Sequence, residues 1–171
     1  SLKNNSYLEF IPEQIIPYKN SRFYQKTTLD IDDSSTVVYS ETIVPGRIAM
    51  GEMFDFDVCY LKTEGAINQK IQFRDSSLLM PKSQKIQSLA MFDDKTILTS
   101  VYVLTKKHVT KINDLINEMF SNIQGISGGS SILPNDSGVS IRILGNSSED
   151  QKITIYQILK IIRKEILPEY L

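Results

Sequence analysis

The sequence predicts a mainly β fold with two helices in its C-terminal part, because the spacing of apolar residues changes partway along the chain. Up to about residue 104 these residues recur at two-residue steps, which is typical of half-buried strands. Beyond that point they recur at three- and four-residue steps, as on one side of a helix. We therefore expect a single β domain, with a strand-rich part at 1–104 and a helix–loop–strand–helix part at 105–171. The strand spacing suits a β-sandwich with appended helices, a barrel or a β-solenoid alike.

The predicted strands follow one another through the first hundred residues. Apolar and polar side chains alternate from 22 to 31, and a second strand at 36–44 is rich in β-branched residues. Short polar residues at 32–35 supply the turn between them, because their side chains bond their own backbone. Pro45-Gly46 breaks the second strand. Shorter runs predict further strands at 54–59, 68–73, 86–92 and 97–104.

The first helix is predicted from about Lys106 to Ile123, where an apolar stripe recurs every three or four residues. Residues 124–138 are rich in glycine and serine, so we expect a mobile surface loop there. One more strand is predicted at 139–144. The two helices are therefore separated by a loop and a strand.

The last helix is predicted to start at Ser148, where Gln151 completes a capping box, and to end at Leu167 before Pro168. Its apolar residues cover more of its circumference than a surface helix needs. We expect this helix to be buried on more than one side or to lie in an interface.

Composition excludes several classes of function. Lys and Arg number 19 and Asp and Glu number 20, a net charge of −1, so no overall field favours nucleic acid or an anionic membrane. Cys59 is the single cysteine, which excludes an internal disulfide framework and suits a reducing compartment. No apolar run approaches the roughly 18 residues that span a bilayer, and the first ten residues lack a signal-peptide core. We therefore expect a cytoplasmic protein that binds neither nucleic acid nor membrane.

The residues that usually carry catalysis are scarce. His108 is the single histidine and falls on the first turn of a predicted helix, where we expect a surface or capping position. Cys59 has no histidine near it in sequence, so we expect a packed, unreactive thiol. These residues build no Ser-His-Asp or Cys-His constellation, and we expect no enzyme activity.

Three carboxylates offer the other candidate chemistry. Asp55 and Asp57 are two positions apart and would share one face of a predicted strand, and Glu52 precedes them. Carboxylates spaced in this way can hold a hard divalent cation. Alternating acids are also typical of a solvated strand face, and this plainer interpretation is the one we favour.

Residues 45–52 (PGRIAMGE) form the most unusual stretch of the sequence. Gly46 and Gly51, five positions apart in a strand-rich region, predict a sharp bend or a close approach of backbone. Arg47 and Glu52 flank this bend and can form a bidentate ion pair across it. We expect the pair to act as a structural clamp.

At this stretch the sequence resembles a known family. GRIAMGEMFDF (46–56) is similar to the G-R-x-x-x-G-E-x-F-x-F signature of the UreD/UreH urease accessory proteins. An upstream segment, YLEFIPEQIIPYKNSRFYQ (7–25), resembles a second motif of that family. The final strand and helix also look like the family's C-terminal end. We expect the chain to correspond to the C-terminal two-thirds of the family, without its N-terminal third.

The resemblance implies a β-helix or solenoid-like fold with two helices, and a scaffold in urease assembly instead of an enzyme. Such proteins bind apo-urease and the F-type urease accessory protein, and through the latter the GTPase that supplies nickel. The resemblance further implies that nickel is delivered to the urease active site through an internal tunnel. Nickel would then be in transit, with no tightly bound cofactor and with room for a dimer inside the complex.

Within this interpretation we also expect particular roles for individual residues. Arg47 and Glu52 would fix the bend that positions a partner or the tunnel surface, and Glu52, Asp55 and Asp57 would touch nickel transiently. Since nickel prefers imidazole or thiolate and the chain has one histidine and one cysteine, any metal would be weakly held by carboxylates. The structural or partner-binding set consists of Glu9, Pro12, Pro17, Arg22, Gly46, Arg47, Gly51 and Glu52.

Two other functions stay open at this point. A divalent-metal-dependent transferase or hydrolase would use Glu52, Asp55 and Asp57 and would bind its metal tightly. A plain structural β domain would dimerise through its C-terminal helices and would need no other partner.

Overall fold

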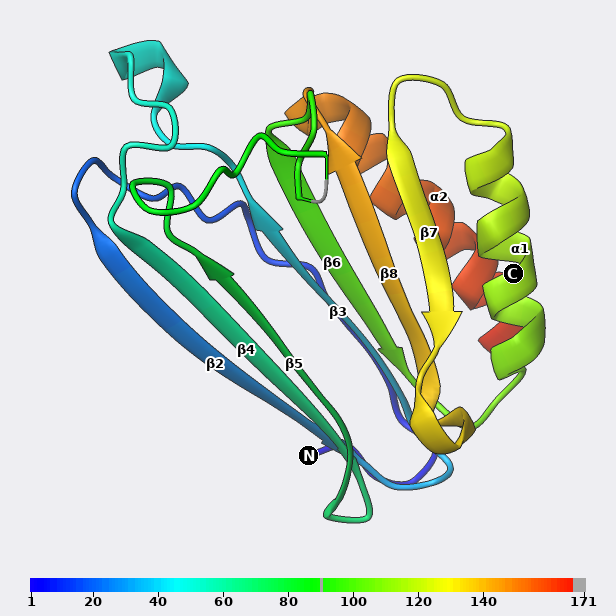
Figure 1. The fold of residues 1–171 in the computed structure, drawn as a ribbon. Helices are drawn as coiled ribbons and strands as arrows, with labels where there is room; N and C mark the ends of the chain where they lie inside the picture. Colours follow the sequence, from blue (N-terminus) through cyan, green and yellow to red (C-terminus); the bar gives the residue numbers. More distant parts are fainter. Residues whose placement is uncertain (90, 168–171) are drawn as a thin grey trace.

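The computed structural model describes residues 1–89 and 91–167, which form two facing β-sheets and two α-helices (Figure 1). One sheet has three strands and the other has five. The helices cover the face of the larger sheet that is turned away from the smaller one. A mainly β fold with two helices is therefore confirmed, and neither sheet closes on itself.

The smaller sheet has the strand order β2-β4-β5. Strand β2 pairs with β4 in parallel, and β4 pairs with β5 in antiparallel orientation. Strand β2 has the bounds predicted from its alternating pattern, with apolar side chains turned inward. The three strands are Arg22–Ile31 (β2), Val58–Ile67 (β4) and Lys70–Leu79 (β5).

The larger sheet has the strand order β1-β3-β6-β8-β7. Its first pair, β1 and β3, is parallel, and the remaining neighbours are antiparallel. The strands predicted at 36–44, 97–104 and 139–144 are confirmed within one or two residues. The five strands are Tyr7–Phe10 (β1), Thr36–Ile43 (β3), Ile97–Leu104 (β6), Ser127–Ile132 (β7) and Gly138–Gly145 (β8).

The first four strands alternate between the two sheets. Strands β1 and β3 lie in the larger sheet and β2 and β4 in the smaller one, and each pair is parallel. The chain therefore winds from sheet to sheet and advances by one strand position on each return. Strands β1 and β2 are left at the sheet edges on the N-terminal side of this winding.

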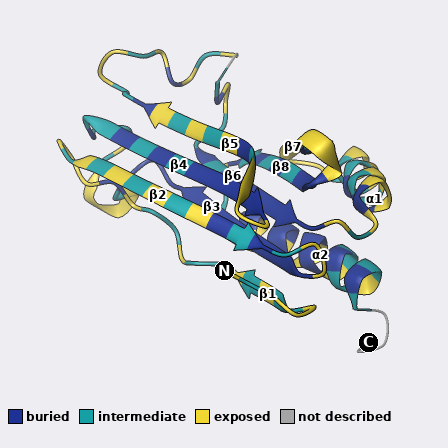
Figure 2. Cartoon of the chain, turned by 90° about the horizontal axis from the view of Figure 1, so that it is seen from below, coloured by how far each residue is buried: buried dark blue, intermediate teal, exposed yellow. Residues whose placement is uncertain are grey.

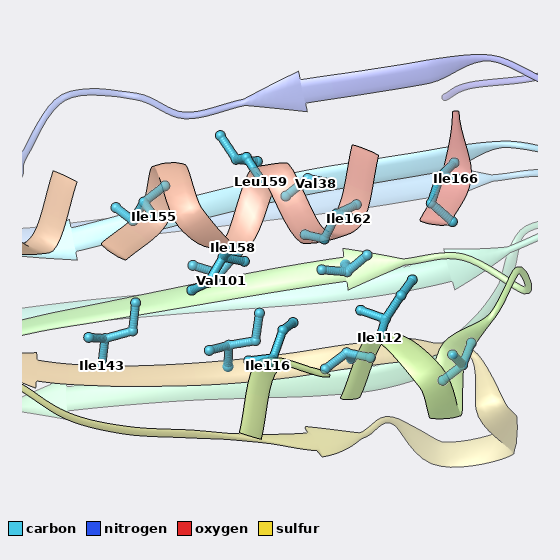
Figure 3. Packing of buried hydrophobic residues seen from close by; sticks show 14 residues of the cluster. Val38, Val101, Ile112, Ile116, Ile143, Ile155, Ile158, Leu159, Ile162 and Ile166 are labelled. Atoms are coloured by element: carbon cyan, nitrogen blue, oxygen red, sulfur yellow. The ribbon is translucent and has the colours of Figure 1, made fainter. Parts of the chain in front are cut away.

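The two helices, Val109–Ser121 (α1) and Ser148–Ile166 (α2), pack on β3, β6 and β8. Figure 3 shows isoleucines of both helices meeting valines and isoleucines of the sheet. In the described ranges neither helix combines the length and apolar character needed to cross a bilayer. Two single-turn 3₁₀ helices, Ile48–Met50 (η1) and Pro134–Asp136 (η2), complete the secondary structure.

The start of α2 differs from the prediction. Ser147, not Ser148, is the N-cap, and its hydroxyl accepts a hydrogen bond from the Asp150 backbone N–H at 3.2 Å. Ser148 instead donates to Gln14 Oε1 at 3.1 Å, and Gln151 is buried, so the predicted capping box is wrong. The helix ends at Ile166, while Pro168, predicted to stop it, lies outside the described residues.

One predicted strand is a loop, and in another, predicted at 54–59, only residues 58 and 59 belong to a strand, β4. Residues 54–57 precede β4 because Phe54 has a φ of 55° and its N–H bonds the Pro45 carbonyl at 2.7 Å, which breaks the extended path. In the run predicted at 86–92, the described residues form turns with local backbone bonds, such as Phe92 N–H to the Ile86 carbonyl. Ile86 and Phe92 are still buried, so the apolar pattern there reflects anchoring of a loop and not a strand.

The strand predicted at 68–73 starts later, because Asn68 and Gln69 form a turn with positive φ.

The predicted mobile loop at 124–138 is wrong in its centre, because residues 127–132 form edge strand β7. The Asn117 side chain of α1 accepts a hydrogen bond from the Ser130 N–H at 2.8 Å and donates one to the Ser130 carbonyl at 3.2 Å. The helix thereby covers part of the strand edge that would otherwise be unpaired. The Phe120 ring of α1 lies directly over Gly128, where a Cβ would come within 2.3 Å of the ring.

These neighbouring glycines provide a matched test of how α1 holds β7. We expect Gly128→Ala to destabilise the protein by about 1–3 kcal/mol, because the added methyl must displace the Phe120 ring. Gly129→Ala should change the free energy of unfolding by about 0.5 kcal/mol or less, since its Cβ would meet its nearest neighbour at an ordinary 3.6 Å. Urea unfolding of both variants measures the difference. Equal effects would show that the ring does not fix β7.

Candidate functional site

Residues 45–53, here called the tip, leave the sheets between β3 and β4 and form a projection that carries η1 (cyan in Figure 1). Gly46 has a φ of 139°, and a Cβ there would lie 2.9 Å from the Glu52 carbonyl oxygen and 3.3 Å from that of Pro17. Only glycine fits such a conformation and so close an approach. Gly51 ends η1 in the left-handed conformation with a φ of 75°. The bend predicted from these two glycines is confirmed.

An ion pair closes the base of the tip. Arg47 Nε donates to Glu52 Oε2 at 2.9 Å, and Arg47 Nη2 donates to Glu52 Oε1, so the predicted bidentate pair is confirmed. Glu52 Oε2 also accepts a hydrogen bond from the Lys19 backbone N–H at 3.1 Å, and the Arg47 guanidinium lies 4.3 Å from the Tyr18 ring centroid. The hydrogen bonds from Arg47 hold the pKa of Glu52 below its usual range. The tip is thereby fastened to the segment before β2.

The tip presents apolar side chains to solvent. Ile48, Met50 and Met53 are 58%, 71% and 46% exposed, and Ile16 and Tyr18 beside them are 48% and 57% exposed. Large apolar side chains grouped on a projection with a fixed base are typical of a protein-binding surface. The arrangement offers contact area and no reactive group.

The structure does not gather the three carboxylates considered for metal binding. Glu52 is engaged by Arg47, while Asp57 binds Lys82 Nζ at 2.5 Å and lies 3.5 Å from Arg22 Nε. The hydrogen bond from Lys82 lowers the pKa of Asp57. Asp55 and Asp57 lie in the loop before β4, so the prediction that they share a strand face is wrong. Among residues 1–89 and 91–167, no group of three or more His, Cys, Asp or Glu is placed to hold a metal ion.

The upstream motif joins the two ends of the chain. Glu9 on β1 accepts hydrogen bonds from Arg163 Nε at 2.7 Å and Nη2 at 2.5 Å, a second bidentate pair. These bonds lower the pKa of Glu9. Pro12 follows β1, and the Pro17 carbonyl lies against Gly46 at the base of the tip. The motif residues thus serve two separate contacts, one to α2 and one to the tip.

A polar cluster that the sequence reasoning missed lies between the two sheets. Its centre is Glu41 on β3, which is 4% exposed. The Tyr39 hydroxyl donates to Glu41 Oε2 at 3.2 Å, and the Thr63 hydroxyl reaches the same oxygen at 3.4 Å. Tyr39 in turn accepts from Gln25 Nε2 at 3.0 Å and from the Thr27 hydroxyl at 3.1 Å. Hydroxyl groups from both sheets therefore converge on one buried carboxyl group.

The cluster continues across the larger sheet. The Tyr102 hydroxyl lies 2.9 Å from Asp75 Oδ2 and 3.5 Å from Glu41 Oε1, so it bridges the two carboxylates. Arg142 on β8 donates to Asp75 through Nη2, and its guanidinium lies 5.4 Å from the Tyr102 ring centroid. Burial raises the pKa of Glu41, and it raises the pKa of Tyr39 to about 12. A line of oxygen atoms thus crosses the space between the sheets.

Four aromatic rings stack through the same space. Phe10 stacks on Tyr39 at 5.8 Å, Tyr39 on Tyr102 at 6.3 Å, and Tyr102 on Phe73 at 5.4 Å between ring centroids. Such offset pairs add stability beyond the area that they bury. The stack positions the rings of Tyr39 and Tyr102, whose hydroxyl groups face Glu41.

The single cysteine and the single histidine, residue types common in nucleophilic sites, do not form such a site. Cys59 is buried, so the predicted packed thiol is confirmed, and burial raises its pKa to about 11. His108 occupies the N-cap of α1 without a side-chain capping bond. The site candidates are therefore the tip and the polar cluster.

Comparison with known proteins gives a consistent result. The family model described as "UreD urease accessory protein" matches residues 1–170. The chain is 34% identical over 146 residues to "Urease accessory protein UreD" of Cenarchaeum symbiosum (strain A), covering 84% of the chain and 51% of that relative. It is 33% identical over 177 residues to "Urease accessory protein UreD 2" of Brucella canis, covering 99% and 59%, and 33% identical over 178 residues to "Urease accessory protein UreD" of Yersinia enterocolitica, covering 98% and 54%. The chain thus spans about half the length of the curated relatives it matches.

The buried Glu41 gives a pH-dependent prediction. Since burial raises its pKa, the folded protein holds this proton more tightly than the unfolded chain does. Its contribution to stability is therefore present at low pH and is lost as the pH rises above the usual carboxyl range. We expect Glu41→Gln to raise the thermal midpoint by roughly a few degrees at pH 8 and to change it little near pH 4. The exposed Glu118→Gln is the matched control, and a lower midpoint for Glu41→Gln at pH 8 would contradict the prediction.

Proposed function

The chain belongs to the UreD urease accessory protein family, and on this premise we propose that it acts in urease maturation as a scaffold and not as an enzyme. Its proposed partners are apo-urease and the F-type urease accessory protein, which connects it to the GTPase that supplies nickel. A dimer inside that complex is part of the same proposal. The observation that supports it is the clamped apolar tip, where the signature residues Arg47 and Glu52 hold a projection with exposed apolar side chains.

We propose the tip as the surface that meets a partner protein. Arg47 and Glu52 hold its base, so its apolar side chains need little further ordering on binding. Met50, 71% exposed, and Ile48, 58% exposed, supply apolar surface that a partner would shield from water. Unbranched methionine side chains adapt to the partner's surface.

Nickel enters the proposal as cargo. Glu41 and Asp75, bridged by the Tyr102 hydroxyl, are the carboxylates that could contact an ion passing between the sheets. Oxygen ligands hold nickel less well than imidazole or thiolate does, so a contact here favours release. The transient contact expected at Glu52, Asp55 and Asp57 is the weaker proposal, because Glu52 and Asp57 are both paired with cations, whereas in the cluster Asp75 is paired with Arg142 but Glu41 is held by hydroxyl groups.

We further propose that β1 to β4 are coils of a β-solenoid. The parallel pairs β1–β3 and β2–β4, with the chain crossing between sheets after each strand, support this winding. The exposed edges of β1 and β2 could pair with strands of the remaining half of a protein as long as the relatives. The transferase alternative gains no support, because two of its three carboxylates are engaged in ion pairs.

A binding experiment with the full-length protein tests the scaffold. We expect it to co-purify with the F-type protein and with apo-urease, and we expect Met50→Asp to weaken one of these associations about tenfold, because a charge would be buried against an apolar surface. Leu89→Asp is the matched control, since Leu89 is 85% exposed and lies outside the tip. Biolayer interferometry gives both dissociation constants. If the folded wild-type protein bound neither the F-type protein nor apo-urease, the proposal would be overturned.

A further inference from the structure

A cluster of cations lies on the outer face of the smaller sheet, the face turned away from the larger sheet in Figure 1. Every second side chain of β2 points outward, and Figure 2 shows the resulting alternation of exposed and partly buried positions. The pairing of β2, β4 and β5 brings the outward side chains of the three strands side by side. The five cations of this basic face, as it is called here, are Arg22, Lys26, Lys62, Arg74 and Lys82.

Cations outnumber carboxylates on the basic face. The five cations contact two carboxylates, Glu64 and Asp57, so the face has a net charge of +3, whereas the whole chain has −1. Asp30, two outward positions beyond Lys26, marks the end of the face and accepts a hydrogen bond from the Gln69 N–H at 3.1 Å. An excess of positive charge on one face of a nearly neutral chain favours a partner of opposite charge.

Three of the cations share a single carboxylate. Glu64 on β4 lies 2.9 Å from Lys26 Nζ and 3.2 Å from Lys62 Nζ, and it accepts a hydrogen bond from Arg74 Nε at 3.0 Å. The bonds from Lys26, Lys62 and Arg74 lower the pKa of Glu64 to about 2, so it is ionised at neutral pH and balances one of three positive charges. Lys26 and Lys62 also stand directly opposite each other on β2 and β4, an arrangement that destabilises a sheet. Unfavourable local arrangements of this kind are typical of functional sites.

Aromatic and apolar side chains lie among these cations. The rings of Tyr24 and Tyr60 are 5.4 Å apart and tilted by 45°, and Leu78, opposite Tyr60, is 45% exposed. Tyrosine, arginine and exposed apolar area together are typical of protein–protein interfaces. Two tilted rings do not form the parallel platform on which the bases of a nucleic acid stack. The face also adjoins the tip, because Arg22 and Arg47 line the same hollow.

We propose that the basic face binds an acidic segment of a partner protein. Carboxylates of that segment pair with Lys26, Lys62 and Arg74 and balance the positive charge that Glu64 leaves over. Its apolar side chains cover Tyr24 and the neighbouring apolar area. The inference rests on the proposed function for its choice of partners, apo-urease and the F-type protein.

The first test neutralises two of the cations in the full-length protein. Lys26→Gln combined with Lys62→Gln leaves Arg74 to pair with Glu64, so we expect a folded variant that binds one purified partner about tenfold more weakly at low salt. Added salt should weaken the variant less than the wild type, because fewer charges remain to be screened. Lys111→Gln combined with Lys152→Gln is the matched control, since these more exposed lysines also form ion pairs but lie on the helices.

The second test removes aromatic area without changing charge. Tyr24→Ser should weaken the same partner, because an exposed ring that the partner covers is lost. Tyr156→Ser on α2 is the matched control, since Tyr156 is 52% exposed, against 59% for Tyr24. An equal loss of affinity in each variant and its control would overturn the proposal.

Lysine acetylation locates the contact. Lys26 and Lys62 should react in the free full-length protein and be protected in the complex. Wild-type affinity for both partners in the lysine variant and in Tyr24→Ser, or lysines unreactive in the free protein, would overturn the proposal and leave the scaffold function standing. If the lysine variant lost only binding to a single-stranded oligonucleotide or to phosphatidylserine vesicles, the proposal would likewise be overturned. Binding of neither partner by the folded wild-type protein would overturn both.

Discussion

Strand β3 is buried on both faces, and the rest of the molecule is arranged around it. All eight of its residues are buried, as the dark ribbon of Figure 2 shows. The two-residue period sends Val38 towards the helices, while Tyr39 and Glu41 face the smaller sheet. A strand in this position contributes side chains to two buried layers, one against the helices and one against the smaller sheet. Its sequence therefore determines that the first layer is apolar and that the second contains polar contacts.

Burial of the Glu41 carboxyl group on β3 is tolerated because several strands provide hydroxyl groups to it. Glu41 would be expensive to bury alone, but hydroxyl groups of Tyr39, Thr63 and Tyr102 surround it. These groups come from β3, β4 and β6, so the carboxyl group is served only when both sheets are in register. The cluster therefore specifies how the two sheets face each other.

The parts of this structure that sequence could predict are those whose pattern is local. Strand β2 alternates cleanly, and the Arg47–Glu52 pair spans a bend marked by two glycines. Strand β7 could not be found, because its glycines and serines carry no period and its pairing comes from β8 and Asn117. The Glu9–Arg163 pair joins residues 154 positions apart. Glu41 did leave a signal, an acid two residues after a tyrosine in an otherwise buried strand, and an alternation analysis of 36–43 would have found it.

The two guanidinium–carboxylate pairs have a common consequence for how the surfaces work. The Arg47–Glu52 pair fixes the base of the tip, and the Glu9–Arg163 pair fixes strand β1 to α2. Both carboxylates have lowered pKa values, so both pairs persist through neutral pH and weaken only in acid. For the scaffold role proposed above this arrangement is favourable, because a surface that is ordered before binding loses less entropy on binding. Packing around β3 therefore fixes the interior, while the two ion pairs fix the tip and the contact between β1 and α2.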